Sequence, residues 1–167
     1  GVQTCALPIY TLVNTQDSLD KLLEILKAAS TICFDTETTS LNYLQAELVG
    51  IGFAVKSQEA FYLPLNGNLS RQDLLTTLKS LFEDPSKQWI GHHLKYDLHI
   101  LANYGIRPKN IAFDTILASY LLHTHRRQHS LDHLSEELLN LNKTSIETLI
   151  GKGKKQISMA DVELEKV

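Results

Sequence analysis

The sequence has few of the features that mark several large classes of protein. It contains two cysteines, Cys5 and Cys33, and no CxxC pair, so it has no disulfide framework and no cysteine-rich zinc site. No apolar run reaches the roughly 18 residues that a membrane span needs. The formal net charge is -3, so no basic excess marks a nucleic-acid-binding surface. These absences favour a cytoplasmic globular protein with no membrane partner.

The first nine residues differ from the rest of the chain. The stretch GVQTCALPI has neither a basic start nor a long apolar segment, so it is not a signal peptide. It resembles the translation of a common sequencing-adapter end; a genuine terminus is the alternative. We therefore set residues 1–9, which include Cys5, apart from the fold. The remaining residues, 10–167, are enough for one domain with a sizeable core.

Short apolar runs alternate with segments of helical spacing along this domain. Runs rich in β-branched and aromatic residues predict strands. They lie at 10–14, 31–35, 47–55, 59–64, 88–91 and 111–113. Leucines at helical spacing predict helices between and after them. Strands dominate the first part and alternate with helices later, which predicts an α/β domain with a mixed sheet flanked by helices.

Polar residues mark where the predicted helices begin. Thr15, Ser70, Asp114 and Ser130 each precede an apolar segment of helical spacing and are expected to be N-caps. Gly105 is expected to end the helix that starts near Leu94. Capping patterns at 144–147 and 158–161 predict two further helical segments, and the polar stretch 123–129 predicts a loop.

Two acids stand at the end of a predicted buried strand. Asp35 and Glu37 are two residues apart in FDTET, and such residues point to the same side of a strand. Two adjacent carboxylates repel each other unless a divalent cation binds them. In open α/β sheets, ligands bind at the carboxyl ends of strands. The pair therefore indicates either a metal site or a solvated acidic turn.

A further acid, Asp97, lies early in a predicted helix that follows a strand. It could complete a metal site with the pair in FDTET. Alone, it is better explained as a first-turn acid that complements the helix dipole. Taken together, the two segments favour the metal site.

Four stretches carry a resemblance to a known family. FDTETTSL, GHHLKYDLHILANYGI, IAFDT and GKGK closely resemble the proofreading 3′→5′ exonuclease domain of bacterial family A polymerases, the DNA polymerase I type. The resemblance runs nearly unbroken from Tyr10 to Val167. It implies a ribonuclease H-like fold and a two-metal nuclease.

By this resemblance, Asp35, Glu37 and Asp97 are catalytic residues and metal ligands. They would bind two divalent cations, Mg²⁺ or Mn²⁺, about 3.5–4 Å apart, together with the scissile phosphate. One cation would activate the attacking water and the other would stabilise the departing 3′ oxygen. Glu37 would also orient the water. Hard oxygen ligands suit these ions.

The resemblance also implies contacts to a single-stranded DNA 3′ end. Thr38 would lie close to the 3′ nucleotide and Leu41 would pack against its base; alternatively, Thr38 is a strand-end cap and Leu41 a core residue. His93 stands where the family usually has Asn, and it could still bind a phosphate or sugar. Ile146 lies near a position where the family tends to have an aromatic residue.

The family's third motif, Tyr-x-x-x-Asp, is expected a few residues beyond Val167. The resemblance therefore implies a domain incomplete at its C-terminus, with a polymerase domain in the same full-length chain. Without the fourth carboxylate we expect weak metal binding and little activity from the 167 residues alone.

Other interpretations stay open at this point. The domain could be a catalytically silent scaffold beside a polymerase, although the presence of all three acids favours the enzyme. It could also be a ribonuclease D-like nuclease that processes RNA 3′ ends. His129 and His133 have the spacing of a helical zinc pair, but surface histidines are the simpler explanation. The lysines of 152–155 could contact phosphates, or belong to a solvated loop.

Overall fold

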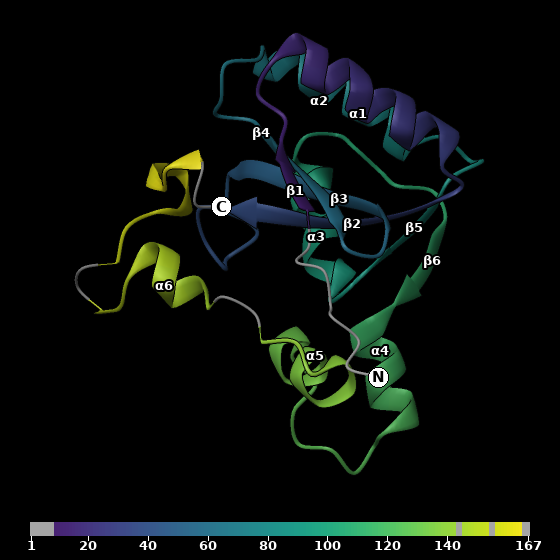
Figure 1. The fold of residues 1–167 in the computed structure, drawn as a ribbon, viewed down its shortest axis with the longest axis vertical. Helices are drawn as coiled ribbons and strands as arrows, with labels where there is room; N and C mark the ends of the chain where they lie inside the picture. The colour runs from purple at the N-terminus through teal and green to yellow at the C-terminus, as the bar shows by residue number, and fades with distance from the viewer. Residues whose placement is uncertain (1–8, 143–144, 154–155, 165–167) are drawn as a thin grey trace, which may run out of the picture.

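The computed structural model describes residues 9–142, 145–153 and 156–164 (Figure 1). Six strands form a mixed sheet in the order β1-β4-β3-β2-β5-β6. β3 is antiparallel to its neighbours β2 and β4, and the other pairings are parallel. The strands are β1 (Ile9–Leu12), β2 (Thr31–Thr38), β3 (Leu48–Lys56), β4 (Glu59–Pro64), β5 (Gln88–Gly91) and β6 (Ile111–Asp114).

Helices flank this sheet, so the α/β fold with a mixed sheet is confirmed. Figure 1 shows α1 and α2 together along one side of the sheet, whereas α4 and α5 lie together at the opposite end of the molecule. The helices are α1 (Gln16–Ala28), α2 (Arg71–Phe82), α3 (Leu94–Asn103), α4 (Thr115–Leu122), α5 (Leu131–Leu139), α6 (Ile146–Ile150) and the 3-10 helix η2 (Met159–Asp161).

The predicted caps account for where the helices begin. The side chains of Thr15, Ser70, Asp114 and Ser130 each accept a hydrogen bond from a backbone amide in the first turn of the helix that follows. Thr15 and Ser18 form a full capping box. Each cap satisfies an amide that the helix itself leaves without a partner.

The remaining predicted helix ends have separate outcomes. Thr144 lies outside the described residues, and Ser145 caps α6 by accepting from the amide of Glu147. Ser158 opens the three-residue 3-10 helix η2 rather than a longer helix. Gly105 adopts a positive φ of 70° one residue after the C-cap Tyr104, a conformation that glycine adopts without strain.

The core lies between the sheet and helices α1 and α2. Phe34 of β2 packs edge-on against Phe82 of α2 and Trp89 of β5, with ring centroids 5.0 and 5.5 Å away. Three leucines of α1 are buried on the same core. Burying one such side chain stabilises the fold by about 1.5–3 kcal/mol. This packing holds β2, the strand of the acid pair, inside the sheet.

The apolar residues of α4 are largely outside this core. Leu117, Tyr120 and Leu121 are 59%, 53% and 80% exposed, so the helix forms but does not bury its predicted apolar residues. A separate apolar pocket of about 290 Å³ lies between α4 and α5. Within the described part of the chain, no helix is long and apolar enough to cross a membrane.

Candidate active site

The two acids of FDTET share one pocket. Asp35 and Glu37 point to the same side of β2 and line a pocket of about 280 Å³, as their spacing predicts. Two glycines of β3 stand opposite them in the antiparallel register, Gly52 beside Asp35 and Gly50 beside Glu37. Because glycine has no side chain, the sheet surface beside Asp35 stays open at Gly52, whereas the phenol of Tyr62 on β4 occupies the space over Gly50.

The residue between the acids holds the third one. Thr36 is buried, and its backbone amide and hydroxyl both donate to Oδ1 of Asp97, at 2.9 and 2.6 Å. Asp97 projects from the first turn of α3 and is 3% exposed. Asp97 of α3 therefore lies against β2, the strand that carries the acid pair, as predicted. Asp97 is not one of the described residues that line the pocket of Asp35 and Glu37.

The surroundings of Asp97 disfavour its negative charge. Burial, and to a lesser extent the charge of Asp35, raise the pKa of Asp97 to about 7, against the lowering effect of the Thr36 hydrogen bonds. Burial and the same two acids also raise the pKa of the Cys33 thiol on β2. Asp35 and Asp97 thus repel each other electrostatically, although they lie on different elements. A bound cation would relieve this repulsion.

The start of α3 is positioned by Asp114, at the end of β6. One carboxylate oxygen accepts from the amides of His93 and Ile116, at 2.9 and 3.0 Å, and the other accepts from the amide of Leu94 at 2.9 Å. One side chain therefore caps α4 and also holds the amides where α3 begins. The sequence predicts the first role but not the second.

His93 has a left-handed backbone, with φ 65° and ψ 37°, and its side chain makes no capping hydrogen bond. Asn and His are among the residues that adopt this conformation most often. A left-handed backbone at this position suits both His and the Asn that the resemblance implies here. A contact between the His93 side chain and substrate stays a prediction.

The two other predicted substrate residues lie at the end of the acid-bearing strand: Thr38 is the last residue of β2 and Leu41 follows in the loop. Leu41 is 94% exposed, which excludes the alternative that it is a core residue. The hydroxyl of Thr38 is 2.6 Å from the hydroxyl of Tyr96 on α3. Tyr96 also donates to the carbonyl of Ser40 at 2.5 Å, which ties this loop to α3.

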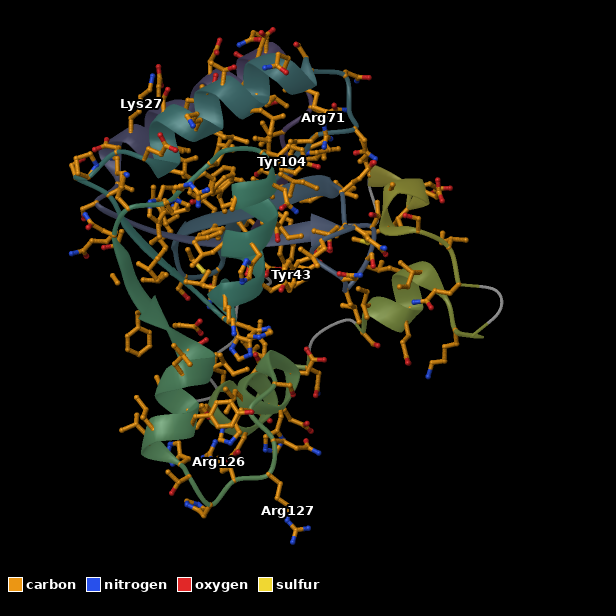
Figure 2. All side chains as sticks on the ribbon, turned by 180° about the vertical axis from the view of Figure 1, so that it is seen from behind. Lys27, Tyr43, Arg71, Tyr104, Arg126 and Arg127 are labelled. Atoms are coloured by element: carbon orange, nitrogen blue, oxygen red, sulfur yellow. The ribbon has the colours of Figure 1, made fainter. Side chains whose placement is uncertain are left out.

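A second set of hydrogen bonds joins α2, β3 and the C-terminal end of α3. Arg71 donates to the carbonyl of Leu48 at 3.0 Å and to the hydroxyl of Tyr104 at 3.1 Å. Figure 2 shows Arg71 and Tyr104 close together, and the Tyr104 hydroxyl also accepts from the Leu48 amide at 3.0 Å. Because Leu48 pairs with Thr38 across β2 and β3, this contact fixes the edge of the site.

The donor set fits a divalent cation in part. Within residues 9–142, 145–153 and 156–164, no group of three or more His, Cys, Asp or Glu side chains is arranged to hold a metal ion. Asp35 and Glu37 nevertheless supply hard oxygens in one pocket. Mg²⁺ is usually bound by one or two carboxylates, with water and substrate phosphates as its other ligands. The pair therefore fits Mg²⁺ or Mn²⁺.

The two histidines with zinc-pair spacing, His129 just before α5 and His133 on it, have other partners. His129 is buried, with Nδ1 2.8 Å from the hydroxyl of Ser119, and its ring stacks on Tyr120. His133 faces Glu137 at 3.3 Å. These separate partners do not support a zinc site.

The basic segments predicted from the sequence are only partly placed by the structure. Lys152 pairs with Glu147 at 2.5 Å, and Lys154 and Lys155 lie outside the described residues. The loop 123–129 is confirmed, and Figure 2 shows Arg127 pointing away from the body of the molecule.

Sequence reasoning missed Tyr62 of β4, which lines the same pocket as Asp35 and Glu37. Burial and the charge of Glu37 raise the pKa of this phenol. A signal for it exists in the sequence, because glycines inside a strand mark places where another group approaches closely. The stretch VGIGF has two such glycines, but it does not say which group approaches.

A mixed sheet with an acid pair on the internal strand β2, and a third acid on α3 hydrogen-bonded to that strand, fits the ribonuclease H-like nucleases. The chain belongs to the 3′-5′ exonuclease family, whose model matches residues 10–163. It is 39% identical over 165 residues to DNA polymerase I of Pseudomonas aeruginosa, covering 93% of this chain and 18% of that protein. The chain is thus of the 3′-5′ exonuclease domain type found in DNA polymerase I, and such domains act on phosphodiester bonds.

Solved structures agree with this fold. Brucella melitensis NrnC with bound Mg²⁺ is 25% identical, with a TM-score of 0.60 over 81% of this chain and 62% of that one. Escherichia coli RNase D, an exoribonuclease involved in structured RNA processing, is 23% identical, with a TM-score of 0.63 over 84% of this chain and 36% of that one. The likeness to RNase D shows only that the fold is shared.

Proposed function

We propose that this domain proofreads DNA, removing nucleotides from single-stranded 3′ ends for a polymerase domain in the same chain. One observation carries the proposal: Asp35 and Glu37 share a pocket, and the charge of Asp35 disfavours the ionised form of Asp97 on α3. A divalent cation would relieve the repulsion between Asp35 and Asp97, so this arrangement is better suited to a metal-bound state. The 18% coverage of the P. aeruginosa polymerase supports a longer parent chain.

In this proposal Asp35, Glu37 and Asp97 would hold two divalent cations, Mg²⁺ or Mn²⁺, which would supply activation of water and stabilisation of the leaving 3′ oxygen. Glu37 orients the attacking water. The exposed Leu41 contacts the terminal base, and Thr38 and His93 contact the 3′ nucleotide. A frayed end exposes the base face that Leu41 needs, which accounts for a preference for unpaired ends.

The test is an exonuclease assay on the parent polypeptide, with 5′-labelled DNA and RNA oligonucleotides of the same sequence. We expect Mg²⁺-dependent shortening of DNA, faster at a mispaired than at a paired 3′ end. Asp35→Ala should abolish it, and Tyr120→Phe on the distant helix α4 is the control. Faster shortening of RNA would support the ribonuclease D-like alternative. No shortening by the wild type would support the silent scaffold, and full activity of Asp35→Ala would refute the role given to Asp35.

A further inference from the structure

Tyr62 reaches across the sheet towards Glu37. The register places Asp35, Gly52 and Tyr62 in one cross-strand row, and Glu37, Gly50 and Pro64 in the next row on the same face. The Tyr62 ring does not stay in its own row. A Cβ atom added to Gly50 would lie 2.3 Å from the Tyr62 hydroxyl oxygen and 2.5 Å from its Cζ. The hydroxyl therefore lies over Gly50, in the row of Glu37.

The Tyr62 hydroxyl is buried and makes no hydrogen bond to any of the described residues. A buried hydroxyl in this state requires an explanation, because nearly all buried polar groups in proteins are paired. The charge of Glu37 is felt at this phenol, and both residues line the acid pocket. The group that the hydroxyl can reach by a small side-chain movement is therefore the Glu37 carboxylate.

We propose that Tyr62 is a positioning residue, whose hydroxyl donates a hydrogen bond to Glu37 when that carboxylate binds a divalent cation. The inference rests on the proposed function, since it needs a cation at Glu37. Carboxylates that bind metals are themselves usually held by hydrogen bonds from neighbouring groups, and losing such a bond weakens metal binding. Gly50 has a defined part in this arrangement, because any side chain there would displace the phenol.

The experiment compares Mn²⁺ binding by the chain and its Tyr62→Phe variant, followed by electron paramagnetic resonance without nucleic acid. Tyr62→Phe removes only the hydroxyl. We expect Mn²⁺ affinity to fall by about 10-fold. Thermal stability without metal should stay the same or rise, because the hydroxyl is unpaired in that state. Gly50→Ala should also weaken Mn²⁺ binding, although it keeps the hydroxyl. Tyr120→Phe, the same chemical change on α4, should alter neither quantity.

The outcomes separate this inference from the proposed function on which it rests. If the wild type binds Mn²⁺, Asp35→Asn does not, and Tyr62→Phe binds as tightly as the wild type, the inference is wrong and the metal site stands. An unchanged Mn²⁺ affinity combined with slower DNA shortening by Tyr62→Phe would place the hydroxyl on substrate and would also overturn it. A clear loss of metal-free stability in Tyr62→Phe would show a purely structural hydrogen bond. If the wild-type chain binds no Mn²⁺, this inference fails, whereas the proposed function is decided separately by the exonuclease assay on the parent polypeptide.

Discussion

Asp97 on α3 accepts two hydrogen bonds at one carboxylate oxygen from Thr36 on β2, from its amide at 2.9 Å and its hydroxyl at 2.6 Å. Thr36 lies between Asp35 and Glu37 in the sequence and points to the opposite side of the strand. The acid from the helix is therefore fastened directly to the strand that carries the acid pair. Every shift of α3 relative to β2 would disturb this contact.

Replacing Thr36 with valine tests this fastening. Thr36→Val keeps the shape but leaves the buried Asp97 with one hydrogen bond fewer. A buried polar group left unsatisfied costs about 1–3 kcal/mol, so the melting temperature should fall by several degrees. Thr36→Ser keeps the hydroxyl and should lose less. A Thr36→Val protein as stable as the wild type, measured by calorimetry, would show that the hydroxyl contributes nothing.

The raised pKa of Asp97 predicts how metal-free stability changes with pH. Its pKa rises from 3.8 to about 7 in the folded chain, so between these values the folded state holds a proton that the unfolded state has lost. Stability should therefore fall as pH rises from about 4 to 7. Above pH 7 the loss of stability due to Asp97 should stay constant. Asp97→Asn cannot ionise and should melt higher than the wild type at pH 8. Equal melting curves at pH 5 and pH 8 for both proteins would contradict the shift.

A divalent cation should stabilise the chain through the acid pocket. At ten times the dissociation constant, a ligand that binds only the folded state adds about 1.4 kcal/mol. Adding MgCl₂ or MnCl₂ at pH 8 should therefore raise the melting temperature of the wild type by a few degrees. CsCl at matched ionic strength is the control. Asp35→Asn and Glu37→Gln should lose most of this rise in melting temperature. An equal rise in the wild type and both variants would place the cation outside the acid pocket.

The two glycines of β3 should respond differently to the same substitution. Gly50→Ala drives a methyl group into the Tyr62 ring, and overpacking of this kind typically costs about 1–3 kcal/mol. At Gly52 the nearest atom to an added Cβ is the Asp35 carbonyl at 3.9 Å, an ordinary contact. Gly52→Ala should therefore keep the wild-type melting temperature or exceed it. The reverse order of stabilities would disprove the packing described for Tyr62.

The left-handed backbone of His93 predicts a substitution series. His93→Asn should be as stable as the wild type, because Asn tolerates this conformation. His93→Val should be less stable by about 1–2 kcal/mol, because the β-branched valine side chain clashes with the backbone in the left-handed conformation. Chemical denaturation measures both. If His93→Asn also keeps full exonuclease activity in the parent polypeptide, the imidazole itself is not needed for substrate binding.

Local sequence patterns were sufficient to predict the order of elements and the common side of the acid pair. A short apolar run predicted β2, the capping residues predicted the starts of α1, α2, α4 and α5, and the two-residue spacing of Asp35 and Glu37 predicted that they point to the same side. Each of these depends on the geometry of one segment, which neighbouring residues dictate. The resemblance to polymerase exonuclease domains added Asp97.

The partners of these residues depend on contacts between distant segments. Thr36 meets Asp97 across 61 positions, and Asp114 meets His93 across 21, so no local pattern announces either contact. The placement of the Tyr62 phenol over Gly50 likewise follows from the register of β3 and β4. The sequence by itself determined the order of the elements and the common side of Asp35 and Glu37. Only the packing of α3 against β2 and the pairing of β4 with β3 decided which groups surround the three acids, because burial and hydrogen bonding arise where separate elements meet.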